Sequence, residues 1–259
     1  MKQIEAVAAL VTRDLRSFAR SRSQLYSSVV LPLMLLAILG AGVSDGLDPR
    51  NIHDYVTFLT PGMIVMTALF SSTFSGASYY QDRDSGILKV LLASPHSPRV
   101  VLLGKMLSAV IIGAAQALIV LAVAAAIPAI HFSWQYGVLP SLGLTIVAIL
   151  FLNLFLAGVG QLLASKIHSM QGFHLVMNLV LFPFLFFSGA FFPLTDLPVW
   201  LKLLGRANPL SYGVDIMHLA LYADGSSGYF GLPLDFAVLT LLALAVFYFG
   251  AGRSVDPDR

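Results

Sequence analysis

The chain has 259 residues, of which 58% are hydrophobic and only 11% are charged. Soluble domains are roughly half apolar and about a quarter charged, so this composition excludes a soluble enzyme, a secreted module and a disordered protein. It predicts a chain that lies in a lipid bilayer. The net charge of +2 gives no electrostatic argument for binding nucleic acid. The absence of cysteine excludes a disulfide framework, thiolate metal sites and cysteine nucleophiles.

Residues 1–24 have the pattern of an amphipathic helix. At about 100° per residue, five apolar side chains fall on one face and three arginines on the opposite face. The apolar face consists of Ile4, Val7, Val11, Leu15 and Phe18, and the basic face of Arg13, Arg16 and Arg20. Such a helix before a span is expected to lie along the inner membrane surface. The alternative is a basic tail that only sets the topology.

Six stretches reach the roughly 20 mostly apolar residues that a membrane-spanning helix needs. The predicted spans are 25–43, 56–80, 101–127, 137–164, 173–193 and 232–252. The first is longer than the apolar core of a signal peptide, roughly 7–15 residues, so we expect it to be retained. The sequence thus predicts an all-α integral membrane protein, with a transmembrane domain at 25–252 and a tail at 253–259.

The lysines and arginines predict how these spans are oriented. With the amino terminus in the cytoplasm, twelve of the fifteen basic residues lie on the cytoplasmic side. Only Arg50, Lys202 and Arg206 lie on the other side. Both termini are therefore expected in the cytoplasm.

The cytoplasmic loop at 81–99 contains a short predicted helix. Asp84 or Ser85 can cap it, and Pro95 ends it. One face of this helix carries Ile87, Leu88, Leu91 and Leu92. A solvated connector has no reason to display four large aliphatic side chains in two turns. From the residues alone, packing against the inner ends of the spans and docking of a cytoplasmic partner explain them equally well.

The loop at 194–231 follows the fifth span and is expected outside. It contains two apolar segments that look helical, are too short to span, and are separated by Asn208-Pro209. Short apolar segments of this kind are candidates for re-entrant helices. The alternative is a pair of helices that lie flat on the outer face, anchored by Trp200 and Tyr222.

The spans carry few chemically reactive groups. Lys105 lies near an inner end, where it can extend to the membrane surface. Gln116, Asn153, Gln161 and Asn178 are expected to form hydrogen bonds between helices, and Ser71, Ser72, Ser75 and Ser78 to act as small packing residues. This pattern disfavours a proton-coupled carrier or a channel with a charged filter. The sequence also lacks the motifs of intramembrane hydrolases and the phosphate-binding loop of ATPases, so any ATP would be bound by another chain.

Two stretches of the sequence resemble the ABC-2 (ATP-binding cassette type-2) permeases, closest to the daunorubicin-resistance type. The first is SGAFFPL at 188–194, followed by LPVWL at 197–201 and NPLSYGVD at 208–215. Its motif positions are Ser188, Gly189, Pro193, Pro198, Trp200, Asn208, Pro209, Tyr212 and Asp215. The second is DRDSGILKVLLASP at 82–95, with Asp82, Arg83, Asp84 and Gly86 at its start. The family often has glutamates where Asp82 and Asp84 stand.

The resemblance implies the membrane subunit of an ATP-driven exporter. The apolar, uncharged spans favour an amphiphilic drug or lipid-like cargo, with a lipid-linked glycan as the alternative, and an ATP-independent carrier is the less favoured function. Two permease copies, identical or different, would pair among the membrane lipids, each on an ATPase subunit that binds ATP and Mg. The permease itself would bind no cofactor, metal or nucleic acid and would catalyse no reaction. The 84–93 helix would couple to the ATPase, and the 1–24 helix would transmit the motion. The expected location is the inner (plasma) membrane of a bacterium or archaeon.

Overall fold

The computed structural model describes residues 2–44, 49–92, 98–128, 130–167, 169–222 and 229–253. Most of the predicted tail at 253–259 lies outside these residues. The described chain contains helices and turns and no strand. In chain order the helices are α1 (Lys2–Arg20), α2 (Arg22–Ser44), α3 (Pro49–Asp84), α4 (Ile87–Leu92), α5 (Pro98–Ala126), α6 (Val138–Lys166), α7 (Met170–Phe186), the 3₁₀ turn η1 (Leu194–Asp196), α8 (Val199–Ala207), α9 (Pro209–Leu221) and α10 (Leu232–Arg253).

Each of the six predicted spans contains a helix, but among the described residues length and composition single out three helices as membrane-crossing. These are the segments Tyr55–Asp84, Val100–Ala126 and Val138–Lys166. The helices α1 and α2 would form a fourth if they were one span, although they are bent by 66° at the break between them. The apolar parts of α7 and α10 are shorter, Met170–Phe186 and Leu232–Val246. Six crossings of the membrane therefore stay a prediction.

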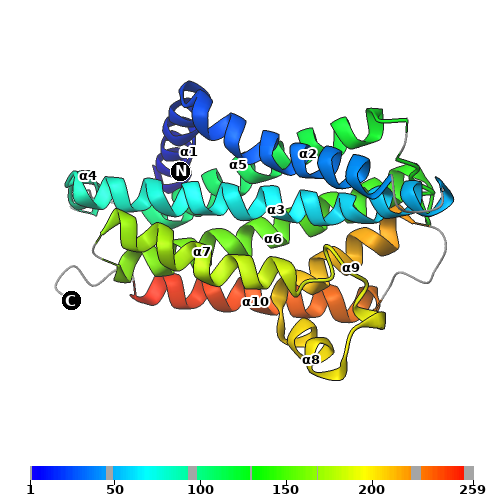
Figure 1. Ribbon diagram of the computed structural model, residues 1–259. Helices are drawn as coiled ribbons and strands as arrows, with labels where there is room; N and C mark the ends of the chain where they lie inside the picture. The colour runs from blue at the N-terminus through cyan, green and yellow to red at the C-terminus, as the bar shows by residue number, and fades with distance from the viewer. Residues whose placement is uncertain are drawn as a thin grey trace.

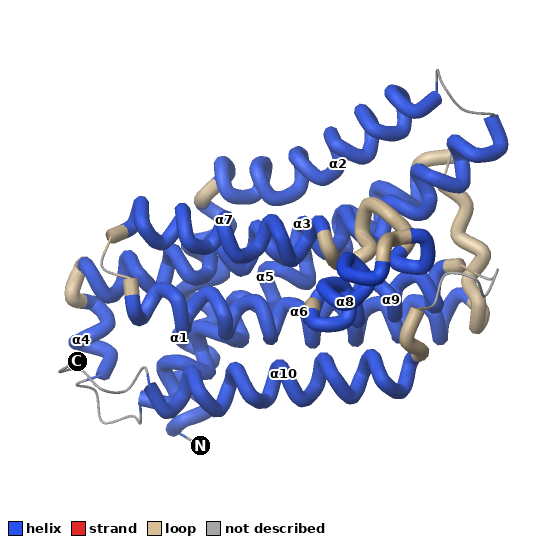
Figure 2. The backbone as a smooth tube through the Cα atoms, turned by 60° about the horizontal axis from the view of Figure 1, so that its bottom comes forward, coloured by secondary structure: helices blue, strands red, loops and turns tan. Residues whose placement is uncertain are grey.

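The long helices lie side by side in one bundle around α3 (Figure 1). The helix α3 packs against α2, α5 and α6, while α10 lies on the far side of α6 (Figure 2). Apolar and small side chains fill the interior, as expected where helices pack closely in lipid. The short helix α4 lies at one end of the bundle, and α8 and α9 lie toward the other (Figure 1). This arrangement separates two candidate functional regions along α3.

The fifth predicted span ends earlier than the sequence suggests. Residues 173–193 were expected to form one helix, but α7 stops at Phe186, and the chain then turns through Ser188 and Gly189. Pro183 lies in the last turn of α7, where Phe187 donates its N–H to the Pro183 carbonyl. Apolar composition continues through Phe191 and Phe192, which is why hydrophobicity alone overestimates this span.

The two short helices predicted in the 194–231 segment are confirmed, and they differ in burial. Nearly every residue of α9 is buried against α6, α10 and α3. In contrast, α8 projects from the bundle (Figure 1) and exposes Val199, Trp200 and Leu203. Asn208 and Pro209 separate them as predicted. The Asn208 side-chain oxygen accepts the N–H of Leu210, which caps α9.

Candidate coupling site and outer pocket

The short helix α4 presents apolar side chains to the surrounding medium. Val90 is 72% exposed and Ile87 43% exposed. Val90 was not on the predicted apolar face. Of the other three residues of that face, Leu88 is buried against the bundle, Leu91 is half-buried, and the side chain of Leu92 lies outside the described part of the chain. Leu88 thus packs against the bundle, as one of the two interpretations expected, whereas docking of a partner stays a prediction.

A tight turn connects α3 to α4. Gly86 has a φ of 76°, a conformation that glycine adopts without steric cost. Its carbonyl accepts the N–H groups of Lys89 and Val90, which begins α4. The sequence predicted that Asp84 or Ser85 caps this helix. The Ser85 hydroxyl instead donates to the Gln81 carbonyl of α3. The start of α4 is thus fixed directly to the end of α3, and a displacement of one must move the other.

Arg83 ties the same end of α3 to α6. Its guanidinium donates to the carbonyls of Ala164, Ser165 and Ile167 at distances of 2.7–3.0 Å. These carbonyls belong to the C-terminal end of α6, where unpaired acceptors and the helix dipole favour a cation. The Arg83 guanidinium also lies 5.1 Å from the ring centre of Tyr80.

Two cations and two carboxylates join α1, α3 and α5 at this end of the bundle. The Lys105 ammonium of α5 forms a salt bridge with Asp82 of α3 and lies 3.5 Å from the carboxylate of Asp14 in α1. Arg13 binds both carboxylates, at 2.6 Å to Asp82 and 2.8 Å to Asp14. We call these four residues the charge cluster. It connects the amphipathic helix to the helix that carries α4.

The charge cluster corrects two sequence-based expectations. The sequence predicted that the Lys105 side chain extends to the membrane surface. It is only 1% exposed, so this prediction is wrong. Arg13 was expected on the basic face of the amphipathic helix with Arg16 and Arg20, which are exposed, but it turns toward α3. On the apolar face Val11 is buried and Phe18 half-buried, whereas Ile4 is 76% exposed. Asp14 is the sequence feature that pointed to the charge cluster, because it is an acidic residue on the apolar face of the amphipathic helix.

At the opposite end of α3, the outer motif folds into a compact turn. The Ser188 hydroxyl donates to the Leu185 carbonyl, and the Asn208 side-chain amide donates to the Phe184 carbonyl. Gly62 of α3 contacts Ala190 so closely that a Cβ atom would lie 2.6 Å from the Ala190 carbonyl oxygen. This contact fixes the motif to α3.

The remaining motif residues form the ends of the short helices. Pro193 precedes η1, and Pro198 precedes α8 and accepts the N–H groups of Leu201 and Lys202. The Tyr212 hydroxyl donates to the Arg206 carbonyl at 2.6 Å, and its ring stacks on Phe230. Trp200 is 62% exposed on α8. These roles are local and structural, and none of them supplies catalytic chemistry.

Asp215 holds the beginning of α10 against α9. Its carboxylate accepts the backbone N–H of Tyr229 at 2.7 Å and of Phe230 at 2.9 Å. Asp235, in the first turn of α10, is fully buried beside Asp215. The sequence reasoning missed Asp235, because an acid near the end of a predicted span looks like an ordinary boundary residue.

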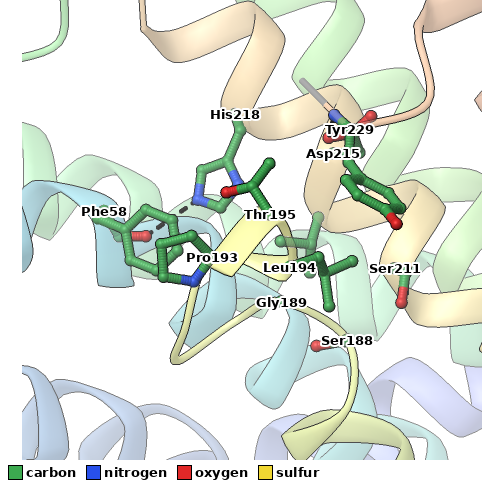
Figure 3. Close-up of a pocket in the computed structure, with 11 residues that line it drawn as sticks. Phe58, Ser188, Gly189, Pro193, Leu194, Thr195, Ser211, Asp215, His218 and Tyr229 are labelled. Carbon is green, nitrogen blue, oxygen red and sulfur yellow. Dashed lines mark hydrogen bonds between the residues drawn. The ribbon is translucent and has the colours of Figure 1, made fainter. Parts of the chain in front are cut away.

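A pocket of about 320 Å³ lies between the outer turn and α9 (Figure 3). Its polar groups come from Ser188, Thr195, Ser211, Asp215 and His218, and Phe58 and Tyr229 form aromatic walls. The His218 ring stacks on Phe58 at 4.6 Å and hydrogen-bonds its carbonyl at 3.1 Å. Because Phe58 belongs to α3, this pocket and α4 are connected by one helix.

The polar residues within the bundle fulfil their predicted role unevenly. Gln116 of α5 donates to the Ser28 hydroxyl of α2, which confirms an interhelical hydrogen bond. Asn153, in contrast, donates to Ile149 within its own helix. The Gln161 amide nitrogen makes no hydrogen bond among the described residues.

The family model described as ABC-2 type transporter matches residues 5–222 of this chain. The chain belongs to the ABC-2 type transporter family. Members of this family are membrane permease subunits, in agreement with the helical bundle and its apolar surface. The permease has one exposed apolar helix at one end of the bundle, and a pocket formed by the outer motif at the other.

Several curated proteins are similar to this permease over much of its length. It is 29% identical over 220 residues to the transport permease ycf38 of Porphyra purpurea, which covers 82% of this chain and 72% of that protein. It is 25% identical over 244 residues to the daunorubicin resistance permease DrrB1 of Streptomyces coeruleorubidus, covering 90% and 81%. It is 29% identical over 174 residues to the multidrug ABC transporter permease YbhR of Escherichia coli, covering 67% and 46%.

The contacts of Asp215 predict that Asp215→Asn and Asp235→Asn change the free energy of unfolding differently. Asp215→Asn replaces one acceptor oxygen by an N–H₂ group that faces backbone donors, so it should lower the free energy of unfolding by about 1–3 kcal/mol. Beside Asp215, Asp235→Asn replaces a fully buried carboxyl group, whose oxygens accept no hydrogen bond among the described residues, by a neutral group of similar size, and should not lower it. Thermal unfolding of the two variants in mild detergent measures the difference. Equal losses of stability would show that Asp215 does not hold α10.

Proposed function

We propose that this permease is the membrane subunit of an ATP-driven exporter, which moves an amphiphilic drug or lipid-like molecule out of the cytoplasm or the inner leaflet. Membership of the ABC-2 family supports a transport subunit. The observation that carries the coupling mechanism is the exposed apolar face of α4, which the Gly86 turn and the charge cluster connect to α3, α1 and α5. In this proposal a separate ATPase subunit binds ATP and Mg and docks on α4.

The helix α3 provides the mechanical link between the two ends. Between Phe58 and Asp84 it is one continuous helix, which at 1.5 Å per residue is about 40 Å long. Movement of α4 by the closing ATPase would displace α3 and, through Arg83, the end of α6. At the other end α3 contributes Phe58 and Gly62 to the outer pocket and its turn. The ATPase would thereby bias the outer pocket between two arrangements.

The proposed cargo rests on the apolar chemistry of the spans and on the names of two relatives. The spans are apolar, and two relatives are named for multidrug transport and daunorubicin resistance, so an amphiphilic drug or lipid is the first candidate. A lipid-linked glycan is the second candidate, because Phe182, Phe184, Phe186 and Phe187 crowd one helix end and aromatic rings stack on sugars. ATP-dependent uptake of daunorubicin into inverted membrane vesicles tests the first. Uptake that does not depend on ATP would favour a carrier instead.

Pairing with a second permease copy is proposed from two apolar stripes. On α2 the exposed side chains are Tyr26, Val30, Met34 and Ile38. On α7 they are Leu175, Leu179, Phe182 and Phe186. Both stripes follow the helical repeat and cover one side of the helix, so either can contact lipid or a second copy.

The proposed topology places α4 in the cytoplasm and the outer pocket outside, with six spans, α1 in the inner interface, α8 in the outer interface, and α9 re-entrant. Because the chain has no cysteine, single variants Val90→Cys and Thr195→Cys report on the two ends. In intact cells a membrane-impermeant maleimide should label position 195 and leave position 90 unlabelled until the cells are opened. The reverse pattern would contradict the orientation.

A further inference from the structure

A second cavity, of about 300 Å³, lies at the α4 side of the bundle between α1, α3 and α5. In Figure 1 these helices converge where α1 crosses the bundle. The wall of this cavity is rich in hydroxyl groups, and we call it the serine pocket. The serines that line it are Ser17, Ser21, Ser71, Ser75, Ser78 and Ser108.

The sequence predicted the serines of α3 to be small packing residues, and three of them also line the serine pocket. Ser71, Ser75 and Ser78 are spaced four and three residues apart, so they share one face of α3, and all three line the pocket. Ser72 does not line it, and its hydroxyl donates to Leu69 within α3. The packing interpretation agrees with the contacts of Ser72, and it did not anticipate that Ser71, Ser75 and Ser78 also line a cavity.

Ser71 indicates that the pocket accommodates a hydrogen-bonding ligand. Ser71 is only 3% exposed, and its hydroxyl makes no hydrogen bond among the described residues. A buried hydroxyl without a partner is unfavourable, because it has lost its hydrogen bonds to water without replacing them. A polar group that enters the pocket would satisfy it.

The charges at the pocket argue against an ionic ligand. Lys105 and Asp14 are in the wall, but the Lys105 ammonium already contacts Asp82, Asp14 and the Ser78 hydroxyl. With Arg13, the charge cluster has two positive and two negative groups. An anion would have to displace a carboxylate from Lys105, and a cation would have to displace Arg13 or Lys105.

The rest of the wall is mixed. Gln24 and Gln81 add amide groups, Phe18, Phe74 and Ile112 contribute apolar side chains, and the neighbouring surface of α5 exposes Leu107 and Ile111. A ligand in this position would therefore meet hydroxyl and amide groups as well as hydrocarbon. The volume is at the lower limit of the roughly 300–1,000 Å³ typical of small-molecule sites, which suits a headgroup rather than a whole lipid.

We propose that the serine pocket binds the uncharged headgroup of an amphiphile, one that carries hydroxyl or amide groups, from the membrane leaflet next to α4. Its role as a cargo site rests on the proposed export function, but the binding itself does not. The pocket thereby selects for neutral polar headgroups over ammonium or sulfate headgroups on the same chain.

Cysteine protection in nanodiscs of phosphatidylcholine tests this selection. The half-buried Ser75 becomes the single cysteine, Ser75→Cys, and Thr195→Cys in the outer pocket is the control. Octyl glucoside, octyltrimethylammonium and octyl sulfate are added below their micelle-forming concentrations, and glucose alone represents the free headgroup. We expect octyl glucoside to slow maleimide labelling of position 75 at least threefold, with smaller effects of the ionic analogues and of glucose, and no change at position 195.

Equal slowing by all three amphiphiles, or no slowing by octyl glucoside, would overturn the proposal. Slowing by glucose as strong as by octyl glucoside would overturn the amphiphile part and leave a sugar site. In the Ser75→Cys background, Ser71→Ala should reduce the protection, and the matched control Ser72→Ala should retain it. No ATPase takes part in this measurement, so its failure would leave the proposed export function to be tested separately.

Discussion

The substitution Val90→Asp is expected to remove the ATPase subunit from the permease. Val90 is the most exposed of the apolar side chains of α4 that the structure describes, and docking would bury it. A carboxylate buried without a partner at an interface is unfavourable by about 2–5 kcal/mol, which corresponds to more than tenfold weaker binding. Co-purification from membranes, with the amount of ATPase measured per permease, tests this. Transport should be lost with it, while membrane insertion stays normal because α4 is outside the proposed spans.

Val199→Asp is the matched control for this experiment. Val199 is 74% exposed on α8, at the opposite end of the bundle, and the substitution introduces the same charge. The Val199→Asp permease should retain the ATPase. Normal ATPase binding by Val90→Asp, or equal losses for both variants, would contradict docking at α4.

The substitution Lys105→Met is expected to have the largest effect on stability. It leaves Asp82 and Asp14 with Arg13 as their only cation in the charge cluster, and both carboxylates are largely buried. Removal of one member of a buried ion pair is unfavourable by about 3–5 kcal/mol. Thermal unfolding in mild detergent should show this loss. The complex formed by any folded fraction should hydrolyse ATP without transporting, since α5 would no longer move with α1 and α3.

Two further variants separate the charge from the size of the side chain. Lys166 is exposed at the end of α6, so Lys166→Met should leave the stability within about 0.5 kcal/mol of the parent. The double variant Lys105→Met with Asp82→Asn restores one positive and one negative group, and should recover part of the loss. If the double variant were less stable than Lys105→Met, the charge cluster would not be the reason for the effect.

Hydrophobic patterning predicts most of this fold because the bilayer restricts the choices. Long apolar segments must be helical in lipid, so the bounds of α5 and α6 follow from the sequence within about three residues. The helix α3 begins at Pro49, well before the predicted start at residue 56. Proline and asparagine predict the break between α8 and α9, because Asn208 caps and Pro209 begins the second helix. The end of α7 was less predictable, since the residues after Phe186 are as apolar as those within it.

The candidate sites depend on contacts between distant segments, which composition does not reveal. The position of Lys105 in its own helix suggested a membrane-surface residue, and only the approach of α1 and α3 makes it the centre of the charge cluster. Asp215 was identified from its motif, but its partners at Tyr229 and Phe230 lie beyond it in sequence. Likewise, the spacing of the serines in α3 is compatible both with residues that pack between helices and with residues that line a cavity. The neighbouring helices decide between these alternatives.

The most direct test of the proposed function is to purify the permease from its native membrane in mild detergent and measure ATP hydrolysis by the purified complex. We expect a stoichiometric subunit that binds ATP, and hydrolysis that disappears from the purified fraction when Val90 is replaced by aspartate but not when Val199 is. A folded permease that purifies without an ATP-binding subunit would contradict the proposal that this chain is driven by ATP.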